Sequence, residues 1–410
     1  MQDQQTPTAP GAAPKAIEFR GVDADFRGLV TSGALLELVT FGFYRFWLAT
    51  NIRRHLWSRT FFAGDSLEYL GTGRELLIGF LFALAILSPV YLLYFLLGVE
   101  AERQYAFASL PLGVFFLAFT QFALYRARRY RLHRTAWRGL RFGMDGSGWL
   151  YAFWAVLWWA FAGLTLGLAY PWAQAALERR KMKHTHYGEA AGRFVGTGWE
   201  FFKRGWWLWA VPMALFVVIA AAAGAAEADA KDGSLGGLGG LGVLGAVLLI
   251  FAYLAAPFVY AAYKAIQWKW WLEGLRVGEA RAMSSLRLSA FFGNIWAYIG
   301  MNVAVLFVGA ILFGIVMFAL DLNGVPLETA SAEGKTPSFV LILAVVPVYL
   351  GVMLAFGVLW RIYFIQRVWK IVVSSLTLYD LEGLEHVASR PGTANALGEG
   401  FADNLDVVGF

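Results

Sequence analysis

Cysteine is absent from this chain of 410 residues, and charged residues make up only 15% of it. The lack of thiols excludes disulfide bonds, iron–sulfur clusters, thiolate metal sites and cysteine nucleophiles. The first 28 residues also lack the apolar core of a signal peptide, because they are polar and rich in Pro, Ala and Gly. We therefore expect residues 1–28 to form a cytoplasmic amino-terminal segment.

Hydrophobic residues, in contrast, make up 59% of the chain, and the mean hydropathy is +0.56. This balance is typical of integral membrane proteins. Six uncharged stretches are long enough to cross a hydrocarbon core of about 30 Å as helices of about 20 residues. The sequence therefore predicts an all-α, polytopic transmembrane helical bundle, whose six full spans cover residues 76–98, 108–125, 206–226, 240–263, 295–320 and 338–360.

The charges of the connections predict the orientation of these spans. Residues 99–107, 227–239 and 321–337 together hold three basic and eight acidic residues, whereas the rest of the chain holds the other 31 of 34 basic residues. The positive-inside rule places the three acidic connections outside and the other connections in the cytoplasm. The spans then form three helical hairpins, and both termini lie in the cytoplasm.

Two further apolar segments, 29–49 and 148–172, resemble spans by hydropathy. A full crossing of 148–172 would move one of its two strongly basic flanks outside, and Glu37 and Arg45 nearly offset the apolar residues of 29–49. We expect both segments to be half-inserted and to return to the cytoplasmic side, with Gly163, Gly167 and Pro171 as break points. The alternative is eight full spans that violate the charge rule.

The chain also contains an internal repeat. A shift of 125 residues, without gaps, gives nine identities over the 36 positions from 40 to 75, among them the Gly-Thr-Gly turns at 71–73 and 196–198. Each copy holds one doubtful segment, one turn and two spans, so the repeat is expected to be parallel. The predicted units are a first repeat 29–125, a basic connection 126–147, a second repeat 148–263, an amphipathic connection 264–294, a third hairpin 295–360 and a cytoplasmic segment 361–410.

Candidate functional residues are most concentrated in two basic stretches, 125–142 and 177–187, where Arg and Lys are interleaved with aromatic residues. Such a surface is suited to anionic lipid headgroups. The alternative is that these charges only anchor the topology. His184 and His186 are a weak metal signal, because in a helix they would face different sides. The headgroup candidates are Arg128, Arg129, Arg131, Arg179, Arg180, Lys181 and Lys183.

The six predicted spans contain no Asp, Glu, Lys, Arg or His. Their absence argues against an ion-coupled pump, which usually exposes an ionisable group to its pathway. Gln121 and Asn302 are the polar candidates for lining a cavity within the spans. Glu37 and Arg45, eight residues apart, are expected to share one helical face. They are candidates for lining the same cavity, and the alternative is that both reach cytoplasmic water.

Four sequence blocks carry a resemblance to a known family: RTAWRGLRFGMDGSGWLYA (134–152), LTLGLAYPW (164–172), HTHYG (184–188) and ALGEGFADNLD (396–406). They resemble the YjgN-like family of bacterial inner-membrane proteins, a family defined as a domain of unknown function. The resemblance covers nearly the whole chain, and it implies an inner-membrane location but no activity, substrate or catalytic residue. The first copy departs from the second at Phe46, which corresponds to Pro171.

Two functions remain compatible with these features. The first is a transporter, channel or lipid-handling protein with a cavity between the repeat units that opens to the cytoplasm. The second is a structural or regulatory protein that senses or organises anionic lipid and recruits a partner. No catalytic arrangement, phosphate loop or dinucleotide motif stands out, so we expect no enzyme, cofactor, metal or nucleic acid, whereas the protein partner and the oligomeric state stay open.

Overall fold

The computed structural model describes residues 15–105, 110–232, 238–323, 339–385 and 387. Parts of the predicted cytoplasmic termini and of the three acidic connections lie outside the described residues. These parts are 1–14, 388–410, 106–107, 233–237 and 324–337.

Within the described residues, six long helices are apolar enough to cross a membrane, and the described part of each predicted span falls in one of them. Residues 108–109 and 338 of two predicted spans lie outside the described residues. The chain is therefore a multi-pass membrane protein. The last of these helices continues beyond α10 through a π-helical turn, η1, into α11. The bounds are α3 Gly73–Gln104, α4 Leu110–His133, α7 Gly198–Asp232, α8 Leu238–Gly274, α9 Leu288–Leu322, α10 Phe339–Trp360, η1 Arg361–Arg367 and α11 Val368–Ser374.

The two doubtful segments are not single helices. Helix α1 (Asp23–Val39) is followed by a turn and by α2 (Arg45–Ser58), and α5 (Gly148–Leu164) is followed by a turn and by α6 (Tyr170–Lys183). Positive φ angles at two successive residues reverse the chain in each turn. These residues are Phe41 (51°) and Gly42 (86°) in the first turn, and Leu166 (51°) and Gly167 (85°) in the second.

Two of the three predicted break points take part in this reversal. Gly167 supplies the left-handed backbone, and Pro171 stands in the first turn of α6, where its missing N–H leaves no hydrogen bond unmade. Gly163 was wrong as a break point, because it lies inside the last turn of α5. Helix α5 has 17 residues and a length of about 26 Å at about 1.5 Å per residue. It is therefore slightly shorter than a full hydrocarbon core.

Eleven short strands form one antiparallel sheet, which the all-α prediction missed. Its order is β1-β11-β10-β9-β8-β7-β6-β5-β4-β3-β2. The two edge strands β1 and β2 are joined by the single residue Ile17, so the chain itself closes the sheet into a ring. The bounds are β1 Lys15–Ala16, β2 Glu18–Phe19, β3 Thr60–Phe62, β4 Asp65–Tyr69, β5 Thr135–Trp137, β6 Leu140–Met144, β7 Thr185–Tyr187, β8 Ala190–Phe194, β9 Leu275–Val277, β10 Ala280–Ser284 and β11 Leu376–Tyr379.

The ring is assembled from four hairpins, each of which directly follows a helix. In three of them the first residue of the hairpin is a threonine whose hydroxyl donates to the carbonyl four residues earlier, at 2.8–2.9 Å. This bond satisfies one of the carbonyls left open at the helix end. The two-residue turns Ala63-Gly64 and Arg138-Gly139 have positive φ at both positions, as type I′ hairpin turns require.

The Gly-Thr-Gly turns connect a strand to a span: the first joins β4 to α3, and the second joins β8 to α7. Thr72 and Glu75 exchange backbone and side-chain hydrogen bonds at the start of α3, at 3.3 and 3.4 Å. Thr197 and Glu200 do the same at the start of α7, at 3.3 and 3.2 Å. Each pair is a capping box, which satisfies amide groups that the first helical turn leaves open.

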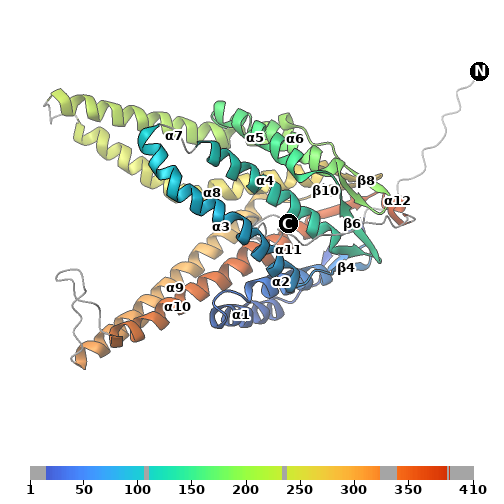
Figure 1. The fold of residues 1–410 in the computed structure, drawn as a ribbon, viewed down its shortest axis with the longest axis horizontal. Coiled ribbons are helices and arrows are strands. Elements are labelled where there is room, and N and C mark those ends of the chain that lie inside the picture. Colours follow the sequence, from blue (N-terminus) through green and yellow to red (C-terminus); the bar gives the residue numbers. More distant parts are fainter. Residues whose placement is uncertain (1–14, 106–109, 233–237, 324–338, 386, 388–410) are drawn as a thin grey trace, which may run out of the picture.

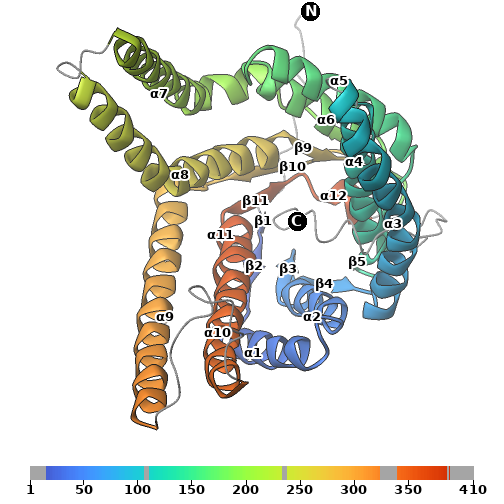
Figure 2. The ribbon, with the colours of Figure 1, turned by 60° about the vertical axis from the view of Figure 1, so that its left-hand side comes forward.

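The strands gather at one end of the molecule, and the long helices leave this end and diverge (Figures 1 and 2). Large apolar side chains are exposed along these helices, for example Phe251 and Phe307, as expected for lipid-facing surfaces. The buried core lies around the ring, with Phe26, Leu56 and Tyr187 in one of its clusters. The ring therefore holds the helices together at this end of the molecule.

Candidate functional site

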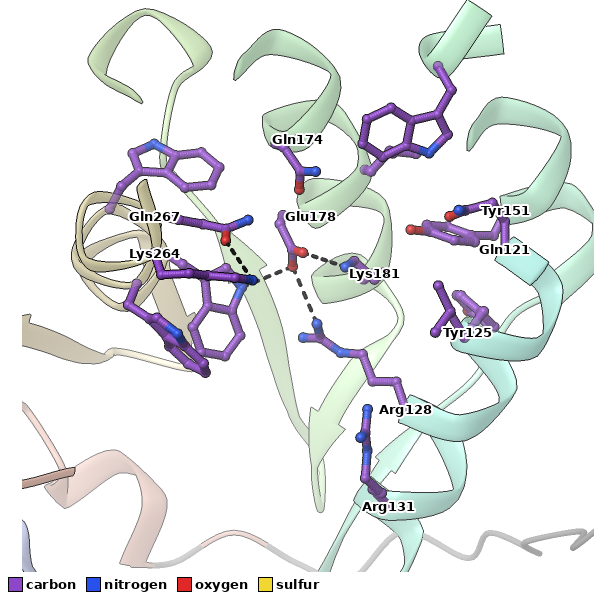
Figure 3. Close-up of a pocket in the computed structure, with 16 residues that line it drawn as sticks. Gln121, Tyr125, Arg128, Arg131, Tyr151, Gln174, Glu178, Lys181, Lys264 and Gln267 are labelled. Carbon is purple, nitrogen blue, oxygen red and sulfur yellow. Dashed lines mark hydrogen bonds and ion pairs between the residues drawn. The ribbon is translucent and has the colours of Figure 1, made fainter. Parts of the chain in front are cut away.

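A cavity of about 270 Å³ lies where α4, α5, α6 and α8 meet beside the ring. We call it the basic cavity. Figure 3 shows its polar side chains pointing toward one another from three of these helices. It is lined by Gln121, Leu124, Tyr125, Arg128, Arg131, Tyr151, Trp159, Gln174, Leu177, Glu178, Lys181, Lys264, Gln267, Trp268, Trp270 and Trp271.

Three of the helices each present a polar face to the basic cavity. The polar and aromatic lining residues recur mostly three or four positions apart, a spacing that places them on one side of a helix. They are Gln121, Tyr125, Arg128 and Arg131 on α4, Gln174, Glu178 and Lys181 on α6, and Lys264, Gln267, Trp268 and Trp271 on α8 (Figure 3).

Glu178 is the centre of the polar contacts in this cavity, and it is only 7% exposed. Its carboxylate pairs with Arg128 at 3.3 Å and with Lys181, and it accepts a hydrogen bond from Trp271 Nε1 at 3.0 Å. Burial alone would raise the pKa of Glu178, but the positive charges of Lys181 and Arg128 outweigh burial and hold the pKa below its usual value. The carboxylate is therefore ionised at neutral pH.

The lining residues carry an excess of positive charge. Four cationic side chains, Arg128, Arg131, Lys181 and Lys264, face one carboxylate, Glu178, which leaves a net charge of +3. Four tryptophans complete the wall, and the guanidinium of Arg128 lies 5.8 Å from the ring centre of Trp271. A partly enclosed site strengthens these charges relative to water, so the cavity is suited to an anionic group.

A pair of tyrosines separates the basic cavity from a groove of about 220 Å³ beside the turn between α5 and α6. The hydroxyl groups of Tyr170 and Tyr263 are hydrogen-bonded to each other, and Gln174 donates to Tyr170 at 2.9 Å. Both tyrosines line the groove, whereas Gln174 lines the basic cavity. The tyrosine pair thus stands between an aromatic groove and a charged cavity.

Four of the residues predicted from the sequence line the basic cavity. They are the headgroup candidates Arg128, Arg131 and Lys181 and the polar candidate Gln121. The sequence interpretation missed Glu178, Gln267 and Trp271. Their spacing of three or four residues along two helices was a signal, but their proximity to α4 depends on packing between distant segments.

The other headgroup candidates do not line this cavity. Arg179 donates to the carbonyl of Gly196 at 3.0 Å, as Arg54 does to Gly71 at 3.3 Å, so both support the turn before a span. Arg180 lies over the ring of Trp154 at 4.2 Å, and Lys183 is exposed. Arg129 is half-buried outside the set of lining residues.

Glu37 and Arg45 do not share one helical face as predicted, because the turn after α1 separates them. Glu37 instead forms an ion pair with Arg361 of the π-helical turn, and Arg45 lies near both charges. Asn302 donates to the carbonyl of Tyr298 on its own helix at 2.7 Å. None of the three lines the basic cavity.

Comparison with known proteins assigns the chain to a family. No curated protein and no solved structure matches it. A family model described as a bacterial protein of unknown function (DUF898) matches residues 14–404, nearly the whole chain. The resemblance seen in the sequence is thereby confirmed, and the chain belongs to this family of bacterial proteins of unknown function.

Proposed function

We propose that this protein is a lipid-handling protein of the bacterial inner membrane, which binds the anionic headgroup of an amphiphile in the basic cavity. The observation that carries the proposal is the net charge of +3 on a cavity walled by four tryptophans, at the end of the long helices. Cationic side chains attract anionic headgroups. Tryptophan, like tyrosine, is enriched at the level of the headgroups in a membrane.

The position of the cavity supports this proposal. Helix α4 begins in the first predicted repeat unit and ends in the basic connection, α5 and α6 belong to the second unit, and the lining residues of α8 belong to the amphipathic connection 264–294. The cavity therefore lies where the two units and their connections meet. We propose that the units arose by duplication, since they share the order of their elements, their reversing turns and their capping boxes. The groove beside Tyr170 and Tyr263 offers a path for a headgroup from the membrane side.

We propose binding and not catalysis. Among the described residues that line the cavity, Glu178 is the single acidic residue. Its carboxylate is engaged in ion pairs with Arg128 and Lys181. A general acid or base needs a pKa near the working pH. The pKa of Glu178 is instead held below its usual value.

The test removes two cavity charges while leaving Arg128 and Lys181, which pair with Glu178, in place. In the variant Arg131→Gln/Lys264→Gln we expect retention of anionic lipid to fall about 30-fold, since each charge contributes about 1 kcal/mol. Retention is measured by native mass spectrometry of the purified protein with phosphatidylglycerol or cardiolipin.

The matched control is Arg129→Gln/Lys269→Gln, which removes one charge from each of the same two helices at positions that do not line the cavity. We expect its lipid retention to match that of the wild type. Equal losses in both variants would show that the basic surface as a whole holds the lipid. No loss in either variant would favour the alternative of a structural or regulatory protein that recruits a partner.

The proposed orientation places the ring of strands and both termini in the cytoplasm, because 31 of 34 basic residues lie outside the three acidic connections. Single cysteines can be introduced at Arg141 and Glu189, which are exposed and flank the α5–α6 hairpin, and at Ser234 and Ser331 in acidic connections. We expect an impermeant thiol reagent to label positions 234 and 331 in intact cells, and positions 141 and 189 only after permeabilisation.

The chain without cysteine provides the background control for this labelling. Labelling of positions 141 and 189 from opposite sides would contradict the half-inserted hairpin and restore a full span there. Labelling of both from outside would reverse the proposed orientation.

A further inference from the structure

A second cavity, of about 310 Å³, lies inside the ring of strands. We call it the ring chamber. Four helices (α2, α4, α8 and α11) and the link between β1 and β2 contribute to its wall together with the strands. Its lining residues are Ile17, Trp57, Thr60, Phe62, Leu67, Arg128, Arg131, Leu132, Thr135, Phe142, Trp268, Trp271, Leu272, Trp369, Val372, Val373 and Leu376.

The polar groups of two tryptophans in this wall are satisfied within the protein. Trp57 Nε1 donates to Thr135 Oγ1 at 3.0 Å, and Trp369 Nε1 donates to Thr60 Oγ1 at 3.0 Å. The indole rings stack with their centres 4.7 Å apart. The two hydroxyls donate onward to helix carbonyls at 2.8 Å. This part of the wall therefore offers water few partners and is suited to hydrocarbon.

The ring chamber and the basic cavity share part of their walls. Arg128, Arg131, Trp268 and Trp271 line both. Leu132 on α4 and Leu272 on α8, each next to a shared residue, line the ring chamber alone. The two arginines therefore stand at the shared wall, the other lining residues of the chamber are uncharged, and the two cavities together form one amphipathic site.

We propose that the ring chamber holds the hydrocarbon chain of the amphiphile whose anionic head occupies the basic cavity. This inference rests on the proposed function and names its ligand class: an amphiphile with a phosphate-like head and an alkyl chain that is withdrawn from the bilayer into the ring. Burial favours chain binding by about fourfold for each methylene group removed from water. Affinity should therefore depend on chain length until the chamber is full.

The probes are butyl phosphate and dodecyl phosphate, bound to the full-length protein in nanodiscs of zwitterionic lipid, with empty nanodiscs as the blank. In the wild type, dodecyl phosphate should bind at least tenfold more tightly than butyl phosphate. The variant Leu67→Trp fills the chamber from β4 and should abolish this ratio while leaving butyl phosphate binding unchanged. Glu68→Trp is the matched control, because Glu68 follows Leu67 in the same strand and its side chain is exposed.

A milder filling variant, Val373→Phe on α11, keeps the test valid if Leu67→Trp misfolds. It should also lower the ratio of dodecyl phosphate affinity to butyl phosphate affinity. A diazirine at the chain end of dodecyl phosphate should cross-link to ring residues such as Phe142 and Leu376. An unchanged ratio in both filling variants, or cross-links confined to the long helices, would overturn the inference. Failure of butyl phosphate to bind the wild type, or to be weakened by Arg131→Gln/Lys264→Gln, would instead overturn the proposed function.

Discussion

Replacement of Glu178 by leucine is expected to lower the free energy of unfolding by about 3–5 kcal/mol. The change leaves Arg128 and Lys181 half-buried without their common carboxylate, and it removes the acceptor of Trp271 Nε1. Removal of one partner of a buried ion pair costs this much because the remaining charge is uncompensated. Thermal unfolding of the protein in a mild detergent, followed by size-exclusion chromatography, measures the effect.

The matched control is Glu273→Leu. Glu273 pairs with Arg204 at 2.7 Å, but Arg204 is 41% exposed, so this change should cost no more than about 1 kcal/mol. The triple variant Glu178→Leu/Arg128→Met/Lys181→Met should recover most of the loss, because no charge is left without a partner. If Glu178→Leu were as mild as Glu273→Leu, the ion pairs around Glu178 would not be a stabilising centre.

The second large effect is expected from alanine at Gly73 and Gly198. A Cβ atom at Gly73 would lie 2.8 Å from Trp47 Cα, and one at Gly198 would lie 2.7 Å from Trp172 Cα. These neighbours are backbone atoms, so a long helix must move away from the short helix before it. We expect each substitution to cost about 1–3 kcal/mol, measured by the same thermal unfolding.

Gly293→Ala is the control, because no heavy atom lies within 4 Å of its added Cβ and the residue is inside α9. That change should be neutral or stabilise by up to about 1 kcal/mol through helix propensity. The two test positions are equivalent under the 125-residue shift. Losses of similar size would support duplication of the unit, and a loss at only one position would contradict it.

The sequence predicted the spans well because hydropathy is a local property. Each of the six predicted stretches lies in a helix long enough to cross a membrane. The charges beside 148–172 and the Gly167 and Pro171 positions likewise indicated a bent segment, since left-handed glycine and proline at a helix start have strong local preferences. These features follow from residues close together in the chain.

The ring of strands could not be found in the same way. Its strands have two to five residues, too few to establish an alternating pattern. Several are basic or aromatic, so they were interpreted as interfacial surface. Lys15 of β1 pairs with Leu378 of β11, and such pairing between distant segments assembles the ring.

The candidate site likewise combines features that the sequence predicts with features that depend on packing between distant segments. The sequence by itself determined that this chain is a multi-pass membrane protein and that basic residues such as Arg128 and Lys181 concentrate in two short stretches, because composition and charge are local properties of the chain. Only the tertiary structure decided that Glu178 and Trp271 join them, since these two residues are 93 positions apart and meet through the packing of α6 and α8. The tertiary structure also decided that an apolar chamber adjoins this charged cavity, because a cavity is a property of packed elements and has no local sequence signal.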